Sequence, residues 1–493
     1  MHLRRPLLYV LAAASLFARI CLSAQEAAPA APAAELTLPQ CITRALARNF
    51  DLEIQRYGPQ IARDSIDIAR DGYQPVVTVT ASRAESHDAA TALTPTSDRS
   101  SGNTSIGVTQ QLYTGTTVSL SSQLDRSRID PALTALNPAY NADLTLSVRQ
   151  QLLKGFGTAI NRAGVNRARI GLDKANLDYK ARVLDIIQST ENAYYDVVFA
   201  REQLEVRKFT QALAERLYDE AKTRRQTGVA TDLDVLTAEV GIANARRAVL
   251  LAQQSVKDTE QTLLTLIGQF ELDTNLGNMS FKEIDEALPV FASSYNLAKQ
   301  SQPDFLSAQA GVEQARLDLK VAKDGTKPSL SVGGALGLNG ARTNGTDAFN
   351  DALENRNHSW QVDLSLTYPW GQIGDKARYR QSLALLNQLQ IHLRQLEQGI
   401  EAQVRTAVRA VETNTASVAI SGQASTLSEK QYELEKARFD AGLSTSYRVL
   451  QAQNDLETAR VSELQSKVSL RNSIAALHRI EGSSLQRYAV TLP

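Results

Sequence analysis

The side chains that could perform acid–base or metal chemistry are few and scattered over the 493 residues. Apart from His2, the histidines are His87, His358, His392 and His478. None of them has a cysteine or a carboxylate at the spacing of a metal site. Three carboxylates recur at helical spacing, which fits a solvated helix face better than a metal site: Asp64, Asp67 and Asp71. The fingerprints of nucleophile, phosphate-loop and dinucleotide sites are absent, so we predict no enzyme activity, no cofactor and no metal.

The N-terminal residues predict export. Arg4 and Arg5 precede an apolar run over residues 7–17, and a plausible cleavage site follows Ala24. We therefore interpret the first 24 residues as a secretory signal. The next segment, residues 25–35, is rich in alanine and proline and is expected to form a flexible arm.

Composition argues for long helices and against a nucleic-acid partner. Only 6% of the residues are aromatic. Without the signal, which carries three arginines, the basic residues fall from 53 to 50 against 53 acidic residues. No later segment approaches the roughly 20 apolar residues of a membrane-spanning helix. Cys21 lacks the small preceding residue of a lipidation site, and Cys41 is then the one remaining cysteine, expected as a small apolar residue on a helix.

The chain is a tandem duplication. At an offset of 214 residues, the turn near residue 228 matches the turn near residue 442, and Glu215 and Arg246 match Glu429 and Arg460. This duplication divides the exported chain into a first repeat (36–268), a linker (269–290) and a second repeat (291–485). Each repeat is expected to contain the same supersecondary elements in the same order.

Helical and strand periods alternate within each repeat. Residues 36–71 have apolar residues at helical spacing, whereas residues 75–152 and 328–370 contain runs that alternate with a period of two. Residues 158–227 and 375–441 contain no proline, so each could form a helix of about 70 residues, or about 105 Å.

A glycine turn follows each long helix. Gly228 and Gly442 can adopt the left-handed conformation that ends a helix. Asp232 and Ser444 are expected to cap the return helices. Because the apolar stripe on these helices is narrow, we expect them to pair as antiparallel, coiled-coil-like hairpins.

The alternating strands fit either a soluble sandwich or a membrane barrel with a wet interior. Export without a helical anchor favours the barrel, as do Tyr113, Trp360, Tyr368 and Trp370, which are expected at strand ends as an interfacial girdle. One strand contains Gly333, Gly334 and Gly337, which suit crowding inside a barrel or bending of the barrel better than phosphate binding. Six strands are too few to close a channel, so oligomerisation must supply the others.

These features together resemble the TolC family of outer-membrane channels. The shared features are the duplicated helix–strand–strand–helix halves, the glycine turn at each hairpin tip, and the Arg/Lys-Asp-Gly-x-x-Pro entry to the strands at Pro75 and Pro328. The resemblance implies an α+β membrane protein whose trimeric β-barrel continues as a long α-helical barrel. It also implies a location in the outer membrane that extends into the periplasm, with a periplasmic adaptor and an inner-membrane pump as partners.

The first repeat carries 39 residues more than the second between its strand entry and its tip. They are expected to add one hairpin over residues 105–126, turning at Thr114-Gly115. This hairpin could enter the barrel and give six strands per chain, or it could fold over the barrel mouth or along its rim. The sequence leaves both arrangements open.

The resemblance also assigns roles to the hairpin tips. The family uses its helical tips for adaptor docking, and here the two apices consist of Gly228, Val229, Ala230, Gly442, Leu443 and Ser444. We therefore predict that these six residues form the docking surface.

A constriction is expected near the same tips. Some family members narrow the closed tunnel with acidic residues at the places where this chain has Arg448 and Gln451. Asp234 is the equivalent of Arg448 in the first repeat, and Asp232 is close by. We expect an ion pair of either aspartate with Arg448, within or between subunits, to hold the tip shut; solvated surface charges are the alternative. Phe439 replaces a tyrosine of the constriction network and can pack there without donating a hydrogen bond.

Two functions are compatible with the sequence. The first is a passive outer-membrane exit duct for drug efflux or type I protein secretion, working with a pump and an adaptor. The alternative is a periplasmic coiled-coil structural or adaptor protein. An adaptor would normally carry one helical hairpin beside a lipoyl-like β-domain, whereas this chain carries two hairpins.

Overall fold

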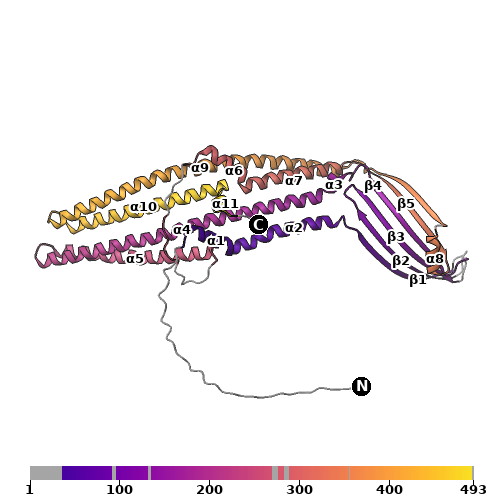
Figure 1. Cartoon of the computed structure of the whole chain (residues 1–493), viewed down its shortest axis with the longest axis horizontal. Helices are drawn as coiled ribbons and strands as arrows, with labels where there is room; N and C mark the ends of the chain where they lie inside the picture. The colour runs from indigo at the N-terminus through magenta and orange to yellow at the C-terminus, as the bar shows by residue number, and fades with distance from the viewer. Residues whose placement is uncertain are drawn as a thin grey trace, which may run out of the picture.

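The computed structural model describes residues 36–90, 96–130, 135–268, 276–281, 288–354 and 356–490. The predicted signal and arm lie outside the described residues, as does much of the predicted linker. The described chain is elongated, with long helices at one end and a sheet at the other (Figure 1). No helix within the described ranges is both long enough and apolar enough to cross a membrane.

Both halves of the chain follow the order helix, helix, strands, long helix, return helix. The first half contains α1 (Leu38–Arg48), α2 (Phe50–Asp71), β1 (Val76–Asp88), β2 (Ser97–Gln111), β3 (Thr116–Asp130), β4 (Ala139–Gln151), α3 (Thr158–Asn161), α4 (Ala163–Gln226) and α5 (Asp232–Leu266). The second half contains α6 (Phe291–Ser301), α7 (Pro303–Gly325), β5 (Ser329–Arg342), α8 (Gly345–Leu353), β6 (His358–Thr367), α9 (Ile373–Asp440), α10 (Ser446–Glu481) and α11 (Ser484–Arg487).

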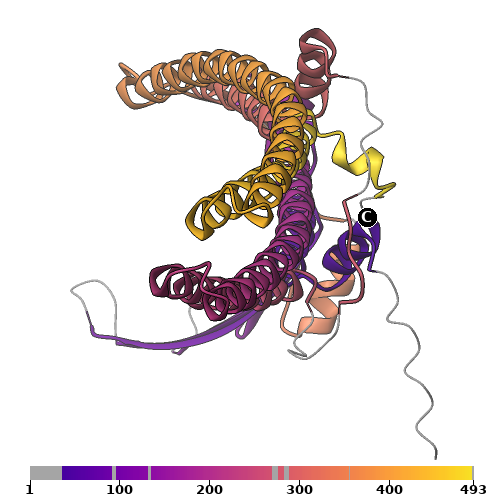
Figure 2. The ribbon, with the colours of Figure 1, turned by 90° about the vertical axis from the view of Figure 1, so that its left-hand side faces the viewer.

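The long helices form the predicted antiparallel hairpins. Helix α4 has 64 residues and α9 has 68, which corresponds to about 100 Å each at 1.5 Å per residue. Each packs along its return helix, α5 or α10, and the tip-proximal parts of the two hairpins share an apolar cluster that includes Leu217, Ala221, Phe439 and Val449. Viewed from the tips, the four helices lie along a curved arc (Figure 2).

One ion pair recurs in both hairpins. Arg246 on α5 lies 3.4 Å from Glu215 on α4, and Arg460 on α10 lies 2.7 Å from Glu429 on α9. These are the residues that the 214-residue offset aligns. The duplication therefore extends from the sequence to the contacts that hold each hairpin together.

The predicted helix over residues 36–71 is interrupted at Asn49. The Asn49 side chain accepts hydrogen bonds from the backbone N–H groups of Asp51 and Leu52, which ends α1 and begins α2. Its Nδ2 also donates to the carbonyl of Leu266, 3.1 Å away on α5. The second half has the same break, because Pro303 at the first turn of α7 follows directly after α6.

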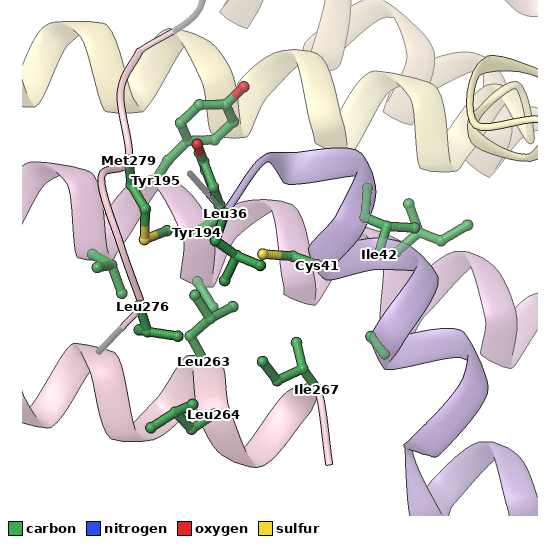
Figure 3. Close-up of a cluster of buried hydrophobic side chains, with 14 of the residues drawn as sticks. Leu36, Cys41, Ile42, Tyr194, Tyr195, Leu263, Leu264, Ile267, Leu276 and Met279 are labelled. Carbon is green, nitrogen blue, oxygen red and sulfur yellow. The ribbon is translucent and has the colours of Figure 1, made fainter. Parts of the chain in front are cut away.

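Helix α1 packs in an apolar cluster with α4 and α5 near the middle of the molecule (Figure 3). Cys41 is fully buried there, beside Ile42 and Leu263. Burial raises the pKa of the Cys41 thiol to about 11, although the charge of Arg44 opposes the shift. The prediction that Cys41 is a small apolar residue on a helix is confirmed.

All six strands form one antiparallel sheet in the order β1-β2-β3-β4-β5-β6. The hairpin of β2 and β3, which turns at residues 112–115, pairs with β1 on one side and with β4 on the other. Of the two arrangements that the sequence leaves open, the structure contains the one in which the extra hairpin joins the sheet. The hairpin is also longer than the predicted 105–126.

Helix α8 was missed by the sequence analysis. It lies between β5 and β6 at the end of the sheet far from the long helices (Figure 1). The Asn344 side chain caps it by accepting from Thr346 N–H at 3.0 Å. Ala348 and Ala352 then pack against Gly340 and Ala142 of the sheet. A helix of nine residues is shorter than the window of 11 to 18 residues over which helical periodicity is read, so it is hard to distinguish from a loop in the sequence.

Candidate functional site

The sheet has one apolar face and one polar face. Since the register of all five strand pairs is continuous, residues can be followed in rows across the sheet. One such row consists of Val77, Val108, Leu120, Leu146, Leu336 and Trp360. The next row, on the opposite face, consists of Thr78, Gly107, Ser121, Thr145, Gly337 and Ser359. Alternation along each strand therefore separates apolar from polar side chains.

Much of the apolar face is left uncovered by the chain's own helices. Val79 is 66% exposed and Leu364 is 70% exposed. Every residue of the edge strand β1 is exposed. Such an extended apolar face with open edges is expected where a lipid or another subunit covers it.

The polar face carries hydrogen-bonded carboxylates. Asn103 donates to Asp125 at 2.7 Å, and Asn339 donates to Asp143 at 2.8 Å. Arg149 pairs with Asp363 at 2.9 Å, reaching across β5 at Gly333. A Cβ atom at Gly333 would lie 2.4 Å from an Asp363 carboxylate oxygen, so this glycine makes room for the ion pair. Of the two roles predicted for the glycines of this strand, crowding fits Gly333, whereas a Cβ atom at Gly334 would meet nothing within 4 Å.

Three of the four aromatic residues expected at strand ends lie at the helix end of the sheet, beside a tyrosine that the sequence analysis did not name. The rings of Tyr113 and Tyr73 are tilted to each other, with 4.3 Å between their centroids, and Tyr368 lies 6.3 Å from Trp370. Trp360 is the third residue of β6 and lies near the other end of that strand, on the apolar face. An interfacial girdle formed by these residues stays a prediction.

The histidines and the aspartates on α2 are dispersed. His87 contacts Asp98 across β1 and β2, both exposed, and Asp67 pairs with Arg70 one turn along α2. Among the residues that the structure describes, no group of three or more His, Cys, Asp and Glu side chains could hold a metal ion.

The two helical tips have the same backbone geometry. Gly228 and Gly442 have φ angles of 78° and 76°, the left-handed region predicted for them. Val229 N–H donates to the Arg224 carbonyl at 2.9 Å, and Leu443 N–H donates to the Arg438 carbonyl at 2.8 Å. Both tips therefore end in a Schellman motif.

Exposed apolar side chains repeat at the two tips. Val229 and Leu443 are 74% and 72% exposed, and Leu233 and Tyr447, also related by the 214-residue offset, are 70% and 66% exposed. The helix caps lie one residue from the predicted positions. The caps are Thr231 and Thr445, instead of Asp232 and Ser444, because the chain becomes helical only after these threonines.

The predicted constriction residues have local partners within the chain. Asp232 pairs with Arg225 at 2.5 Å, and Asp234 accepts hydrogen bonds from the Thr231 backbone and hydroxyl. Gln451 donates to Asp455 at 3.0 Å. Arg448 is exposed, and within the described ranges of this chain it forms no ion pair with Asp232 or Asp234.

Arg224 links the two hairpins near their tips, and the sequence analysis missed it. Its guanidinium lies 4.0 Å from the centroid of the buried Phe439 ring and donates to the Phe439 carbonyl at 2.7 Å. It also lies 3.5 Å from the Asp440 carboxylate. Phe439 therefore packs as expected, but against a cation from the other hairpin.

A second ion pair supports this link. Lys436 on α9 lies 3.1 Å from Glu220 on α4. Burial alone would lower the pKa of Lys436, but the hydrogen bond and the charge of Glu220 outweigh burial and raise it. The two hairpins are thus held together by charged contacts on both sides of Phe439.

Replacing Arg224 with alanine should loosen the two tips relative to each other. We expect the distance distribution between spin labels on Val229→Cys and Leu443→Cys to broaden, because the cation–π contact and the hydrogen bond are both lost. Cys41 should stay unlabelled, since burial keeps its thiol protonated. The matched control is Arg438→Ala at the equivalent place in the second repeat, where the side chain pairs with Glu435 of its own helix. Equal broadening in both variants would contradict the assigned role of Arg224.

Comparison with known proteins is consistent with this geometry. The family model described as "Outer membrane efflux protein" matches residues 115–269 and 294–483. The chain is 23% identical over 354 residues to the pyoverdine export outer membrane protein OpmQ of Pseudomonas aeruginosa, covering 71% of each chain. It is 22% identical over 434 residues to the outer membrane efflux protein BepC of Brucella suis, covering 87% of this chain and 82% of BepC.

Solved structures show the same fold. The outer-membrane channel OprN aligns over 90% of this chain and 89% of its own, with a TM-score of 0.69 and 19% identity. The outer membrane protein VceC of Vibrio cholerae aligns over 90% of this chain and 96% of its own, with a TM-score of 0.66 and 16% identity.

Proposed function

Because this chain belongs to the outer membrane efflux protein family and is an outer-membrane efflux channel, we propose that three copies of it form a passive exit duct. The observation that supports the proposal best is a two-faced sheet with open edges, joined end to end with helical hairpins about 100 Å long. The apolar face would contact outer-membrane lipid, and the polar face would line the aqueous lumen.

Six strands per chain allow three copies, related by threefold symmetry, to close into one barrel. Six antiparallel strands place β1 and β6 in opposite directions, so β6 of one subunit can pair antiparallel with β1 of the next. Three chains then give a barrel of eighteen strands without an open edge. Barrels of 16 to 18 strands are wide enough to leave an aqueous channel.

The helical part would continue the duct into the periplasm. The curved arc of α4, α5, α9 and α10 has the shape of one segment of a ring wall (Figure 2). The repeated exposed apolar residues at the tips offer matching docking points for a periplasmic adaptor, which would connect the duct to an inner-membrane pump. The duct would carry drugs or a type I secreted protein using the energy of that pump, without chemistry of its own.

The alternative function is a periplasmic coiled-coil spacer. It does not explain why the sheet has a wide, exposed apolar face. Fractionation separates the two functions. A detergent-extracted outer-membrane trimer whose electrophoretic mobility changes on heating is expected for the duct. Release of a soluble monomer by osmotic shock would instead favour the spacer.

The seam between subunits can be tested by disulfide crosslinking. Thr78→Cys on the polar face of β1 should crosslink with at least one of Ser359→Cys, Gln361→Cys and Ser365→Cys on the polar face of β6. Covalent trimers are the expected product, seen on denaturing gels without reductant. Thr78→Cys with Val362→Cys is the control, because these side chains face opposite sides of the sheet. Crosslinking of the control alone, or of no polar-face pair, would contradict the seam.

A further inference from the structure

A row of basic side chains crosses the apolar face of the sheet just beyond its apolar rows. By strand register, Arg83 on β1, Gly102 on β2, Arg126 on β3, Tyr140 on β4 and Arg342 on β5 lie side by side. The adjacent row toward the helices is apolar or small on every strand and consists of Ala81, Thr104, Leu124, Ala142 and Gly340. The change from apolar to basic therefore happens within one step of two residues, about 7 Å.

At the level of this row, the positive charge lies on the face of the apolar rows. On the polar face at the same level the register places Ser82, Asn103, Asp125, Asn141 and Ala341, none of which is basic. The arginines instead belong to the surface that adjoins the apolar rows.

The position of Arg126 along its strand matches the thickness of a bilayer. From Thr116, the first residue of β3 at the helix end, to Arg126 there are ten residue steps, or about 33 Å along the strand. With strands tilted by about 40°, this distance becomes about 25 Å along the membrane normal, which is the usual height of the apolar band of an outer-membrane barrel. Arg83 lies seven residue steps from Val76, the first residue of β1, or about 18 Å at the same tilt, and its long side chain can extend to the same outer boundary.

Two of the three arginines in this row pair with a carboxylate of the same chain. Arg83 contacts Glu85, and Arg342 pairs with Asp351 of α8 at 2.6 Å. Within the described ranges Arg126 forms no ion pair. Gly102 has no side chain, so a gap about 10 Å wide separates the backbones of the strands that carry Arg83 and Arg126.

We propose that the gap between Arg83 and Arg126 binds the phosphate group of a phosphorylated glycolipid in the outer leaflet. The proposal rests on the proposed function, since it requires this face to contact the outer membrane. A guanidinium matches a phosphate in both charge and bidentate geometry. The acyl chains of the same lipid would lie along the apolar residues of β1 and β2 that begin at Ala81, because α8 packs against Leu124 on β3. The Tyr140 ring beside Arg126 suits the interface between the headgroups and the acyl chains.

The test compares two lipids on the purified trimer. Bis-phosphorylated lipid A and its fully dephosphorylated form are each added in detergent, and bound lipid per trimer is counted by native mass spectrometry. The wild-type trimer should retain the phosphorylated form roughly tenfold more strongly, because charge-assisted pairs are lost with the phosphates. Equal retention of the two lipids by the wild type would overturn the proposal without any variant.

Variants then locate the site. Arg83→Gln with Arg126→Gln should remove most of the preference for phosphate, whereas Arg83→Lys with Arg126→Lys should keep part of it. Arg99→Gln is the matched control, because Arg99 lies on the same end of β2 but on the opposite face. An Arg99→Gln variant that loses the preference as strongly as the double glutamine variant would overturn the assignment.

The experiments would give a different result if the proposed function as a duct were wrong. If the proposed function were wrong, the wild-type chain would form no heat-modifiable outer-membrane trimer and no conducting channel in planar bilayers. A conducting trimer that does not distinguish the two lipids would remove the lipid site alone.

Discussion

Replacing Gly442 with valine should abolish export while the amount of trimer in the outer membrane stays normal. Gly442 has a φ angle of 76°, and a left-handed backbone costs an L-residue roughly 1–2 kcal/mol, with a further penalty for a β-branched side chain. A Cβ atom at this position would meet no other atom within 4 Å. The substitution therefore changes the turn through backbone strain and not through a clash.

The altered turn would move the residues proposed to dock the adaptor. The Leu443 N–H group bonds to the Arg438 carbonyl only while Gly442 keeps its left-handed conformation. Once that bond is lost, the exposed side chain of Leu443 no longer matches the position of Val229 at the other tip. Because three copies of each tip would engage the adaptor ring, the loss should be large in an export assay.

Two control variants make the result specific. Gly442→Asn should retain most export, because asparagine tolerates the left-handed region. Gly422→Val lies inside α9, where a Cβ atom also meets nothing within 4 Å and the φ angle is helical, so it should behave like the wild type. If Gly442→Val instead removed the trimer, the glycine would act in folding and the docking role would be unsupported.

The sequence predicted the long elements well because their periodic signals extend over many residues. The proline-free runs ending at Gly228 and Gly442 became α4 and α9, and the period-two runs became strands. The break at Asn49 was missed although its cause is local, because the Asn49 side chain caps α2 by accepting from the N–H groups of Asp51 and Leu52. A further hydrogen bond joins Asn49 to Leu266, more than 200 residues away, and no local pattern contains that contact.

The functional sites also divide into those that a local sequence pattern predicts and those that depend on contacts between distant residues. The tip glycines could be located from the sequence because a helix C-terminus has a local signature. The role of Arg224 could not, because its partners Phe439 and Asp440 belong to the other hairpin. The basic row on the sheet was hidden for a similar reason. Arg83, Arg126 and Arg342 are far apart in sequence, and strand register alone brings them into line.

Reversing Arg448 to glutamate should open the closed tip and raise conductance in planar bilayers. Within one chain Asp232 is engaged by Arg225, and Asp234 accepts hydrogen bonds from Thr231, the cap of α5. The exposed Arg448 must therefore find any aspartate partner on a neighbouring subunit, where threefold symmetry repeats the contact. An exposed ion pair contributes up to about 1 kcal/mol, so three of them amount to about 3 kcal/mol, or a roughly hundredfold change in the ratio of open to closed tips.

A charge-reversal variant and the effect of salt on conductance distinguish such an ion pair between subunits from solvated surface charges. Asp234→Lys in the Arg448→Glu background restores opposite charges and should partly close the tip, although it also removes the hydrogen bonds that Thr231 donates to the Asp234 carboxylate. High salt should reduce the difference between the variant and the wild type, because screening acts over about 8 to 10 Å. Arg394→Glu is the control: Arg394 is also exposed but lies on α9 about 70 Å from the tip, so its conductance should match the wild type. Unchanged conductance in Arg448→Glu would mean that these charges are solvated and that the contacts of Arg224 and Lys436 between the hairpins hold the tip without them.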